Sequence, residues 1–195
     1  MANPNHPPRG AETKVEAIRD PKKIQMIKKL LADSPRNSAL FTLGINTNLR
    51  ASDLIRLTAG QVRHLKPGDE LVLKERKTGK PRRITLNKSA VGAIQALLSS
   101  QALGDHDPLF RSQRGEALTV GSVHRLVKSW CRDIGLKGNF GSHSLRKTFG
   151  YHARLAGIDV PTLMTLFNHS SQRQTLAYLG VQPEELKDAY MKLEL

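Results

Sequence analysis

The sequence SHSLR at residues 142–146 opens a predicted helix and places His143 and Arg146 three positions apart. Side chains at this spacing leave an α-helix from one face. A histidine exchanges a proton near neutral pH, and an arginine fork binds two oxygens of one phosphate. The pair suits phosphoryl transfer, although so short a pattern on its own is more often part of a solvated basic helix.

Two further stretches carry candidate residues. Residues 166–178 read LFNHSSQRQTLAY and place His169 ahead of Tyr178, which is either a nucleophile or a tyrosine packed at a surface edge. Residues 47–54 read TNLRASDL, and Arg50 follows a predicted buried helix. A buried arginine is costly unless it is paired or used, and Asp53 at i+3 is the expected partner.

The charge of the chain points to a polyanionic partner. Lys and Arg number 31 against 17 Asp and Glu, which gives a net charge of +14 spread along the sequence. Such a field favours nucleic acid, although an indifferent basic surface is the alternative. The single cysteine, Cys131, excludes a disulfide framework, and no usual ligand spacing indicates a metal. With no apolar run of about 18 residues and no signal peptide, we expect a cytoplasmic protein without a membrane partner.

The periodicity predicts a mainly α fold that carries one small antiparallel β-hairpin. Residues 1–19 read as a flexible tail, and one domain follows over residues 20–195. The KTGK sequence, residues 77–80, forms the tip of the hairpin. Strands are predicted at 71–73 and 84–86, and helices at 21–31, 38–45, 51–57, from 88, from 120, at 142–157, from 160, from 171, and at 183–194.

Taken in chain order, these residues resemble the catalytic elements of the tyrosine recombinase, or phage integrase, family. The matching words are TNLRASDL, KTGK, HSLR, LFNHSS and TLAYLG, and the resemblance covers about residues 20–195. Several matches in one order are far more specific than any one of them. The catalytic residues that the resemblance implies are Arg50, Lys77, His143, Arg146, His169 and Tyr178.

The sequence also departs from the family pattern. Asn48 and Asn168 stand where the family usually has glycine, and Asp53 replaces a more common glutamate. Most members carry a separate N-terminal helical domain that clamps the DNA, and residues 1–19 cannot form one. In this respect the chain is similar to the short fimbrial-switch recombinases.

The resemblance implies a site-specific DNA recombinase in which Tyr178 forms a 3′-phosphotyrosyl bond without ATP, a metal or another cofactor. Arg50, Arg146 and His169 would bind the phosphate, and His143 would assist proton handling. The hairpin lysine that protonates the leaving group would be Lys77, with Lys80 and Lys74 as less favoured substitutes. Asp53 would support Arg50.

The implied partners are double-stranded DNA and further copies of the chain. The predicted helix over residues 183–194 packs either on its own domain or on a neighbouring subunit of a tetramer on paired DNA sites; an accessory protein that replaces the clamp stays open. The alternatives are a type IB topoisomerase-like enzyme and an inactive DNA-binding accessory protein. The candidates for DNA contact are Lys74, Arg76, Lys80, Arg82, Arg83, Lys147 and Arg173.

Overall fold

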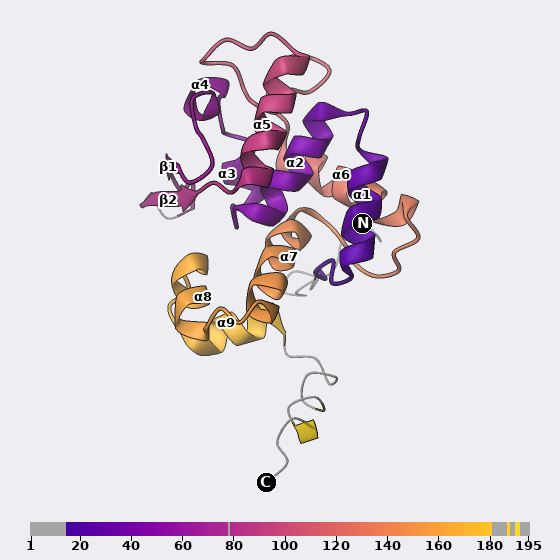
Figure 1. Cartoon of the computed structure of the whole chain (residues 1–195), viewed down its shortest axis with the longest axis vertical. Coiled ribbons are helices and arrows are strands. Elements are labelled where there is room, and N and C mark those ends of the chain that lie inside the picture. The colour runs from indigo at the N-terminus through magenta and orange to yellow at the C-terminus, as the bar shows by residue number, and fades with distance from the viewer. Residues whose placement is uncertain (1–14, 78, 181–186, 188–189, 192–195) are drawn as a thin grey trace, which may run out of the picture.

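The computed structural model describes residues 15–77, 79–180, 187, 190 and 191, which form a mainly helical fold with one two-stranded sheet (Figure 1). This confirms the predicted fold class. No described helix is both long and apolar enough to cross a membrane. The elements are α1 (Pro21–Leu30), α2 (Pro35–Asn46), α3 (Ala51–Leu54), α4 (Ala59–Val62), β1 (Glu70–Lys74), β2 (Pro81–Thr85), α5 (Lys88–Ser100), α6 (Val120–Asp133), α7 (Ser142–Leu155), α8 (Val160–Phe167) and α9 (Gln172–Leu179).

Polar caps set several helix starts where the sequence predicted them. The side chains of Asp20, Asn87 and Thr119 accept hydrogen bonds from backbone N–H groups in the first turns of α1, α5 and α6. Each cap satisfies a donor that has no partner within the helix. The capping residues therefore fix these three boundaries locally, before any tertiary contact is considered.

Two helix boundaries differ from the prediction by three residues. Helix α2 begins at Pro35 rather than Ser38, because a proline, which has no N–H group, fits the first helical position. Helix α3 ends at Leu54 rather than Leu57. The Leu57 carbonyl accepts the N–H of Leu109 at 2.8 Å instead of continuing the helix, and the unpredicted α4 follows. Tertiary pairing overrides local propensity at this point.

One large core joins α1–α6 to the first half of α7. Helix α2 lies at its centre and packs against α5 and α7. Phe41 on α2 is fully buried and meets Trp130 on α6 edge to face, with ring centroids 6.1 Å apart. Gly44 lets α2 approach α7 closely, since a Cβ atom there would lie 2.5 Å from Leu145 Cδ1. The core thus fixes the position of the helix that carries SHSLR.

The segment of residues 15–19 corrects the predicted tail. Ile18 is 1% exposed and belongs to the large core. Its N–H donates to Thr148 Oγ1 at 2.8 Å, and its carbonyl lies 3.0 Å from His152 Nε2. The tail expected over residues 1–19 is therefore wrong for residues 15–19, while residues 1–14 lie outside the described part. Val15, Ala17 and Ile18 are the apolar residues of this short segment, and three residues give too little periodicity to predict that Ile18 is buried.

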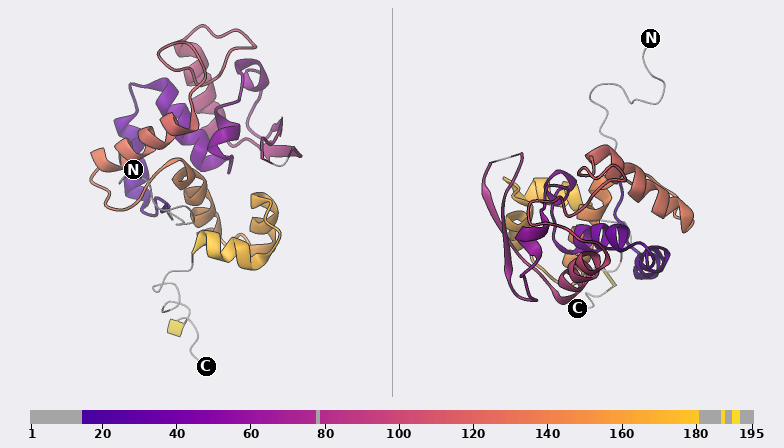
Figure 2. Two further views of the ribbon diagram at one scale, coloured as in Figure 1. Left: turned by 180° about the vertical axis from the view of Figure 1, so that it is seen from behind. Right: turned by 90° about the horizontal axis from the view of Figure 1, so that it is seen from above.

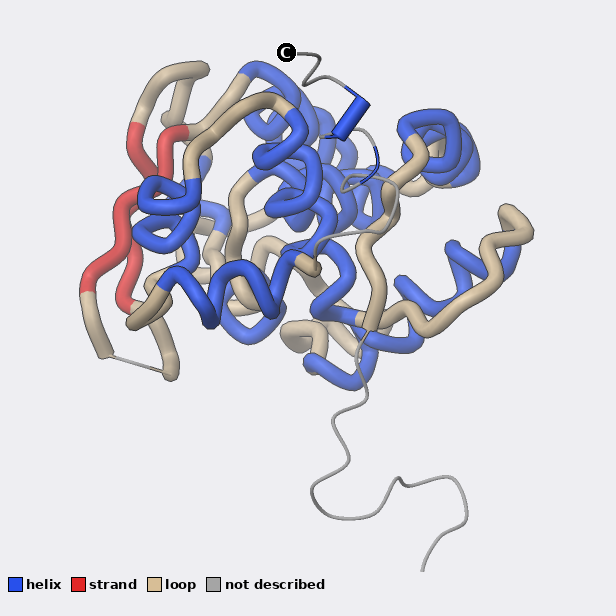
Figure 3. Tube along the Cα trace, turned by 90° about the horizontal axis from the view of Figure 1, so that it is seen from below, coloured by secondary structure: helices blue, strands red, loops and turns tan. Residues whose placement is uncertain are grey.

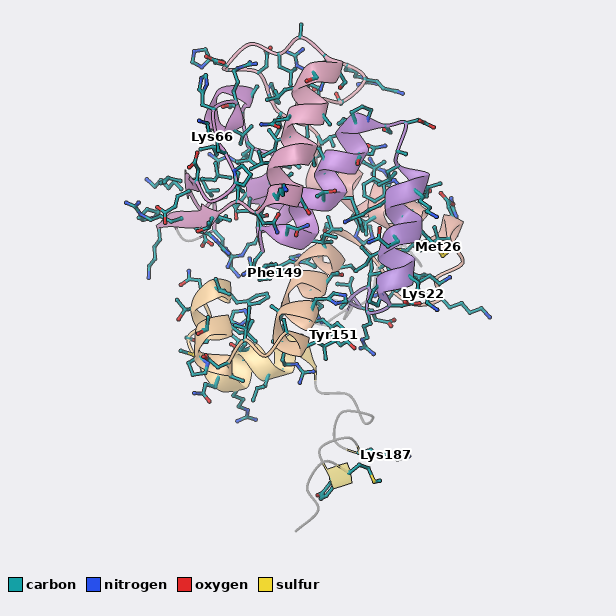
Figure 4. All side chains as sticks on the ribbon, in the orientation of Figure 1. Lys22, Met26, Lys66, Phe149, Tyr151 and Lys187 are labelled. Atoms are coloured by element: carbon teal, nitrogen blue, oxygen red, sulfur yellow. The ribbon has the colours of Figure 1, made fainter. Side chains whose placement is uncertain are left out.

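The predicted hairpin is present at one edge of the molecule (Figure 3). Strands β1 and β2 are antiparallel, and Leu71 pairs with Ile84. Both of these side chains are buried, so they attach the hairpin to the large core. The described residues of the loop that follows, 75–77, 79 and 80, extend from this attachment and include three of the four KTGK residues.

The second half of α7 forms a small separate cluster with α8 and α9. Its buried apolar residues are Ala153, Leu163, Phe167 and Leu179. In Figures 1 and 2, α8 and α9 lie at the end of the molecule opposite α5, with α7 between them and the larger body. Of the helix predicted over residues 183–194, all but residues 187, 190 and 191 lie outside the described part.

Candidate active site

The SHSLR stretch forms the first turns of α7, as the sequence predicted. At the start of this helix the N–H of Gly141 donates to Ser144 Oγ at 3.0 Å. His143 is exposed, whereas Arg146 is only 4% exposed. The motif therefore places one accessible imidazole and one buried cation at the same end of a helix.

Arg146 is held between α7 and the end of α8. Its Nη2 donates to the Phe167 carbonyl at 2.8 Å, and the guanidinium lies 5.0 Å from the centroid of the Phe167 ring. Its Nη1 is buried and has no hydrogen-bond partner among the described residues. Burial lowers the pKa of Arg146 to about 10. A buried cation with an unused donor is suited to receive an anion.

Arg50 approaches from the large core. It occupies the capping position of α3 in extended backbone, and its Nη1 forms an ion pair with Glu75 Oε2 at 2.9 Å. The prediction that Asp53 pairs with Arg50 is wrong, because the spacing i to i+3 brings side chains together only when both residues are helical. Asp53 instead accepts the backbone N–H of Arg76 at 2.9 Å and so holds the hairpin.

The sequence did not single out Glu75, which is at the centre of this region. Its carboxylate binds Arg50 through one oxygen and Arg82 Nη1 through the other, at 2.7 Å. Arg82 Nη2 also donates to the carbonyls of Asn48 and Leu166, at 3.1 and 2.9 Å. Arg82, a predicted DNA contact, is 11% exposed, and its guanidinium is bonded to these groups within the protein.

A signal for Glu75 was present in the strand pattern. Side chains alternate between the two faces of a strand, so Glu75 shares the parity of Leu71 and Leu73. Leu71 is buried and Leu73 half-buried, which predicts an inward position for Glu75. Because Lys74 and Arg76 flank Glu75, the sequence suggests instead a run of charged residues that are all exposed to solvent.

His169 and Tyr178 lie together at the edge of the small cluster. Their ring centroids are 5.4 Å apart, and Tyr178 also meets Phe167 at 5.2 Å. His169 Nδ1 lies 3.1 Å from Thr175 Oγ1, which holds the imidazole against α9. Lys147 Nζ lies 5.1 Å from the centroid of the Tyr178 ring. The Tyr178 hydroxyl is buried and finds no hydrogen-bond partner in the described part of the chain.

Electrostatic interactions join five of the candidate side chains. Burial raises the pKa of Tyr178, and the charges of Arg146 and Arg50 oppose this rise. Desolvation by neighbouring protein atoms lowers the pKa of both His143 and His169, and Arg146 and Arg50 lower it further. The structure therefore brings these five groups, from three distant segments of the chain, into one field.

Lys77 lies apart from this group. It is exposed in the loop between β1 and β2 and is not among the charged groups that shift the pKa of Arg146, His169 or Tyr178. The other predicted DNA contacts, Arg82 and the half-buried Lys147 apart, are also exposed: Lys74, Arg76, Lys80, Arg83 and Arg173.

The two asparagines that depart from the family pattern adopt the backbone conformation that glycine favours. Asn48 and Asn168 are the non-glycine residues with positive φ, at 54° and 53°, among those described. Asparagine tolerates this left-handed region better than most residues. Asn48 Nδ2 also donates to the Leu166 carbonyl at 2.6 Å. Both substitutions keep the turns before Arg50 and His169.

The phage integrase family model matches residues 20–185 of the chain. The chain is 34% identical over 178 residues to the probable integrase/recombinase YoeC of Bacillus subtilis strain 168, a match that covers 90% of this chain and 95% of YoeC. It is 31% identical over 179 residues to the tyrosine recombinase XerC of Caldanaerobacter subterraneus subsp. tengcongensis. That match covers 87% of this chain and 49% of XerC, so the chain spans about half of this relative.

A solved structure shares the fold. The XerH site-specific recombinase bound to its palindromic difH substrate, in a post-cleavage complex, matches with a TM-score of 0.75 at 19% identity. The match covers 92% of this chain and 53% of XerH. At this identity the likeness establishes the shared fold.

Proposed function

Because the chain belongs to the phage integrase family of tyrosine recombinases, we propose that it is a site-specific DNA recombinase that cuts and rejoins strands through Tyr178. The observation that carries this proposal is that two buried atoms of the site, Arg146 Nη1 and Tyr178 Oη, have no partner among the described residues, while the buried Arg50 Nη1 has an ion pair but no hydrogen bond. A phosphodiester beside both atoms would give the arginine an acceptor and the phenol an electrophile.

In the proposed reaction, Tyr178 Oη attacks the phosphorus, a phosphotyrosyl bond to the 3′ side forms, and the bond to the 5′ oxygen breaks. One phosphate ester replaces another, so the step requires no ATP. Negative charge grows on the non-bridging oxygens as the phosphorus becomes five-coordinate. Arg146 and Arg50 would bind these oxygens, and His169 would donate a further hydrogen bond. Two arginine forks supply here the positive charge that a metal ion supplies elsewhere.

Proton transfer in this proposal needs a donor and an acceptor. Tyr178 is the neutral phenol at neutral pH because its pKa is raised, and its proton must leave as the bond to phosphorus forms. His143, exposed and neutral because its pKa is lowered, would take part in this transfer. The departing 5′ oxygen would receive a proton from Lys77, which requires the hairpin loop to close on the bound DNA.

The DNA-binding surface is proposed from exposed cations on both sides of the site. Lys80 and Arg83 lie on the hairpin side, and Arg173 lies on α9. Such contacts bind the phosphate backbone and carry no sequence preference. Assembly of four copies on paired sites, through the segment around residues 183–194 or with an accessory protein, belongs to this proposal as well.

A trapping experiment tests the function. A duplex is first selected from a random-sequence pool by its binding to the full chain. It is then nicked, so that the short fragment with the freed 5′ hydroxyl diffuses away after cleavage and the adduct persists. The wild-type chain should form a covalent DNA adduct on a denaturing gel, and Tyr178→Phe should form none while it binds the duplex with the same affinity. Tyr151→Phe is the matched control, because Tyr151 lies on α7 beside Arg19 and should keep the adduct.

Three other outcomes would contradict parts of the proposal. An adduct with Tyr178→Phe would remove Tyr178 as the nucleophile. Tight binding by the wild-type chain without any adduct would favour the DNA-binding accessory protein. An adduct with relaxation of supercoiled DNA but no exchange between two sites would favour the topoisomerase-like enzyme.

A further inference from the structure

We propose that Glu75 is a positioning residue of this active site: its buried carboxylate fixes the Arg50 guanidinium and, through Arg82, the hairpin that carries Lys77. The kinetic consequences of this inference rest on the proposed function. The fixed orientation of Arg50 does not, and it is tested separately without DNA.

The geometry of the carboxylate supports this role. Glu75 Oε2 meets Arg50 Nη1 at 2.9 Å, and Glu75 Oε1 meets Arg82 Nη1 at 2.7 Å. The three side chains are 2%, 18% and 11% exposed, so little water reaches the pairs. The contact to Arg82 is a charge-assisted hydrogen bond, and the contact to Arg50 is an ion pair without hydrogen-bond geometry; opposite charges this close and this little exposed attract strongly. Arg50 Nη1 therefore lies against the Glu75 carboxylate, and this attraction restricts the orientations that the guanidinium can adopt.

Arg82 extends this constraint to two other segments. Its Nη2 donates to the carbonyl of Asn48, two residues before Arg50, and to the carbonyl of Leu166, three residues before His169. Glu75 itself lies two residues before Lys77 in the hairpin. The Glu75 and Arg82 pair thus connects the three chain segments that carry Arg50, Lys77 and His169.

The sign of the charge separates positioning from substrate binding. A carboxylate near a phosphate site repels DNA, so Glu75 weakens binding rather than strengthening it. If it positions Arg50, its removal should slow cleavage while binding is kept or becomes tighter. A carboxylate that only stabilised the fold would, when removed, reduce binding and cleavage together.

The experiment compares Glu75→Gln with Glu70→Gln in the full chain. Glu70 is the matched control, because it lies on the same strand and pairs with Arg83 at 2.9 Å, but both side chains are exposed. Loss of orientation at a reacting centre lowers rates by up to about 100-fold, so we expect Glu75→Gln to cleave the nicked duplex roughly 10- to 100-fold more slowly. Its affinity for the duplex should stay within about threefold or increase, and Glu70→Gln should cleave at the wild-type rate.

The same substitution in an Arg50 variant shows whether Glu75 acts through Arg50. In Arg50→Lys, which retains the charge but not the fork, Glu75→Gln should slow cleavage by less than about threefold, because residues that act as a unit are not additive. An equal slowing in both backgrounds would overturn the proposal. If Glu75→Gln does not fold, Glu75→Asp, with a shorter reach and the same charge, is compared in the same way.

The orientation of Arg50 is measured on the DNA-free protein by NMR of the arginine side-chain nitrogens. Wild type and Glu70→Gln should show slow rotation of the Arg50 guanidinium, and Glu75→Gln or Glu75→Asp should show fast rotation. Unchanged rotation would overturn the proposal even if cleavage is never detected. A wild-type chain that forms no adduct, with the expected NMR difference, would count against the proposed function alone.

Discussion

The two parts of the molecule that meet at the candidate active site differ in the size of their buried apolar cores. Arg50 and the hairpin belong to the large core of α1–α6, whereas His169 and Tyr178 are carried by α8 and α9, whose cluster has four buried apolar residues. Buried apolar area contributes roughly 25 cal/mol per Å², so the small cluster is held far more weakly. Local opening begins in such regions. Arg50 therefore lies on the more stable part of the molecule, and Tyr178, the proposed nucleophile, lies on the part that opens more readily.

The largest effect is expected from a substitution of Arg146, which joins α7 to the end of α8. We expect Arg146→Met to cleave the nicked duplex roughly 10² to 10³ times more slowly, the loss typical of one transition-state donor. The fold disfavours the charged guanidinium, since burial lowers its pKa to about 10. An apolar side chain of similar length should therefore change the free energy of unfolding by less than about 2 kcal/mol. Single-turnover cleavage and urea unfolding measure the two effects, and a large stability loss would show a mainly structural role.

The small cluster is tested by Gly150→Ala. A Cβ atom at Gly150 would overlap Leu179 and lie 2.6 Å from Phe167 Cζ. Overpacking of this kind costs about 1–3 kcal/mol. Hydrogen exchange should accelerate in α8 and α9 and stay slow in α2 and α5, because the large core does not depend on this contact.

Gly92→Ala in α5 is the control for helix propensity. Nothing lies within 4 Å of a Cβ atom there, so alanine should stabilise the protein by about 0.5–1 kcal/mol. Opposite signs at the two glycines would support the close approach at Gly150. Uniform acceleration of exchange across both parts in Gly150→Ala would show that the small cluster is not an independent unit.

The sequence predicts most of this fold because the relevant signals are local. Capping residues such as Asn87, the hairpin alternation and the SHSLR pattern all lie within a few residues of the structure they determine. The burial of Ile18 and the pairing of Glu75 with Arg82 depend instead on contacts between distant segments. The predicted pair of Arg50 with Asp53 failed for the same reason: a local spacing rule was applied where the backbone is extended and a distant carboxylate is available.

A pH titration compares the two parts without mutation. The pKa of His143 and of His169 is lowered in the fold, so the native state binds fewer protons than the unfolded chain below about pH 6.5. The native state is therefore more stable relative to the unfolded chain above that pH, and it loses this stability as the pH falls and the histidines become protonated. Unfolding free energy should decrease from about pH 6.5 to 5, with exchange rising first in α8 and α9, because protonated His169 is repelled by Arg146 and Arg50.

His169→Gln should reduce this pH dependence, as measured by urea unfolding across the same pH range. The neutral amide cannot gain the charge that opposes the two arginines. An unchanged slope in the variant would mean that the histidine does not contribute to the loss of stability at low pH.

The smallest effects are expected at the left-handed asparagines, and they show where the two parts are joined. Asn168→Gly keeps the turn and removes no side-chain hydrogen bond to another described residue, so stability should change by no more than about 0.5 kcal/mol. Asn48→Gly also keeps the turn but removes the bond from Nδ2 to the Leu166 carbonyl, which should cost about 0.5–1.5 kcal/mol. That carbonyl still accepts Arg82 Nη2, so it is not left without a donor. If both variants unfold alike, the side chain of Asn48 does not stabilise the contact between the large core and α8.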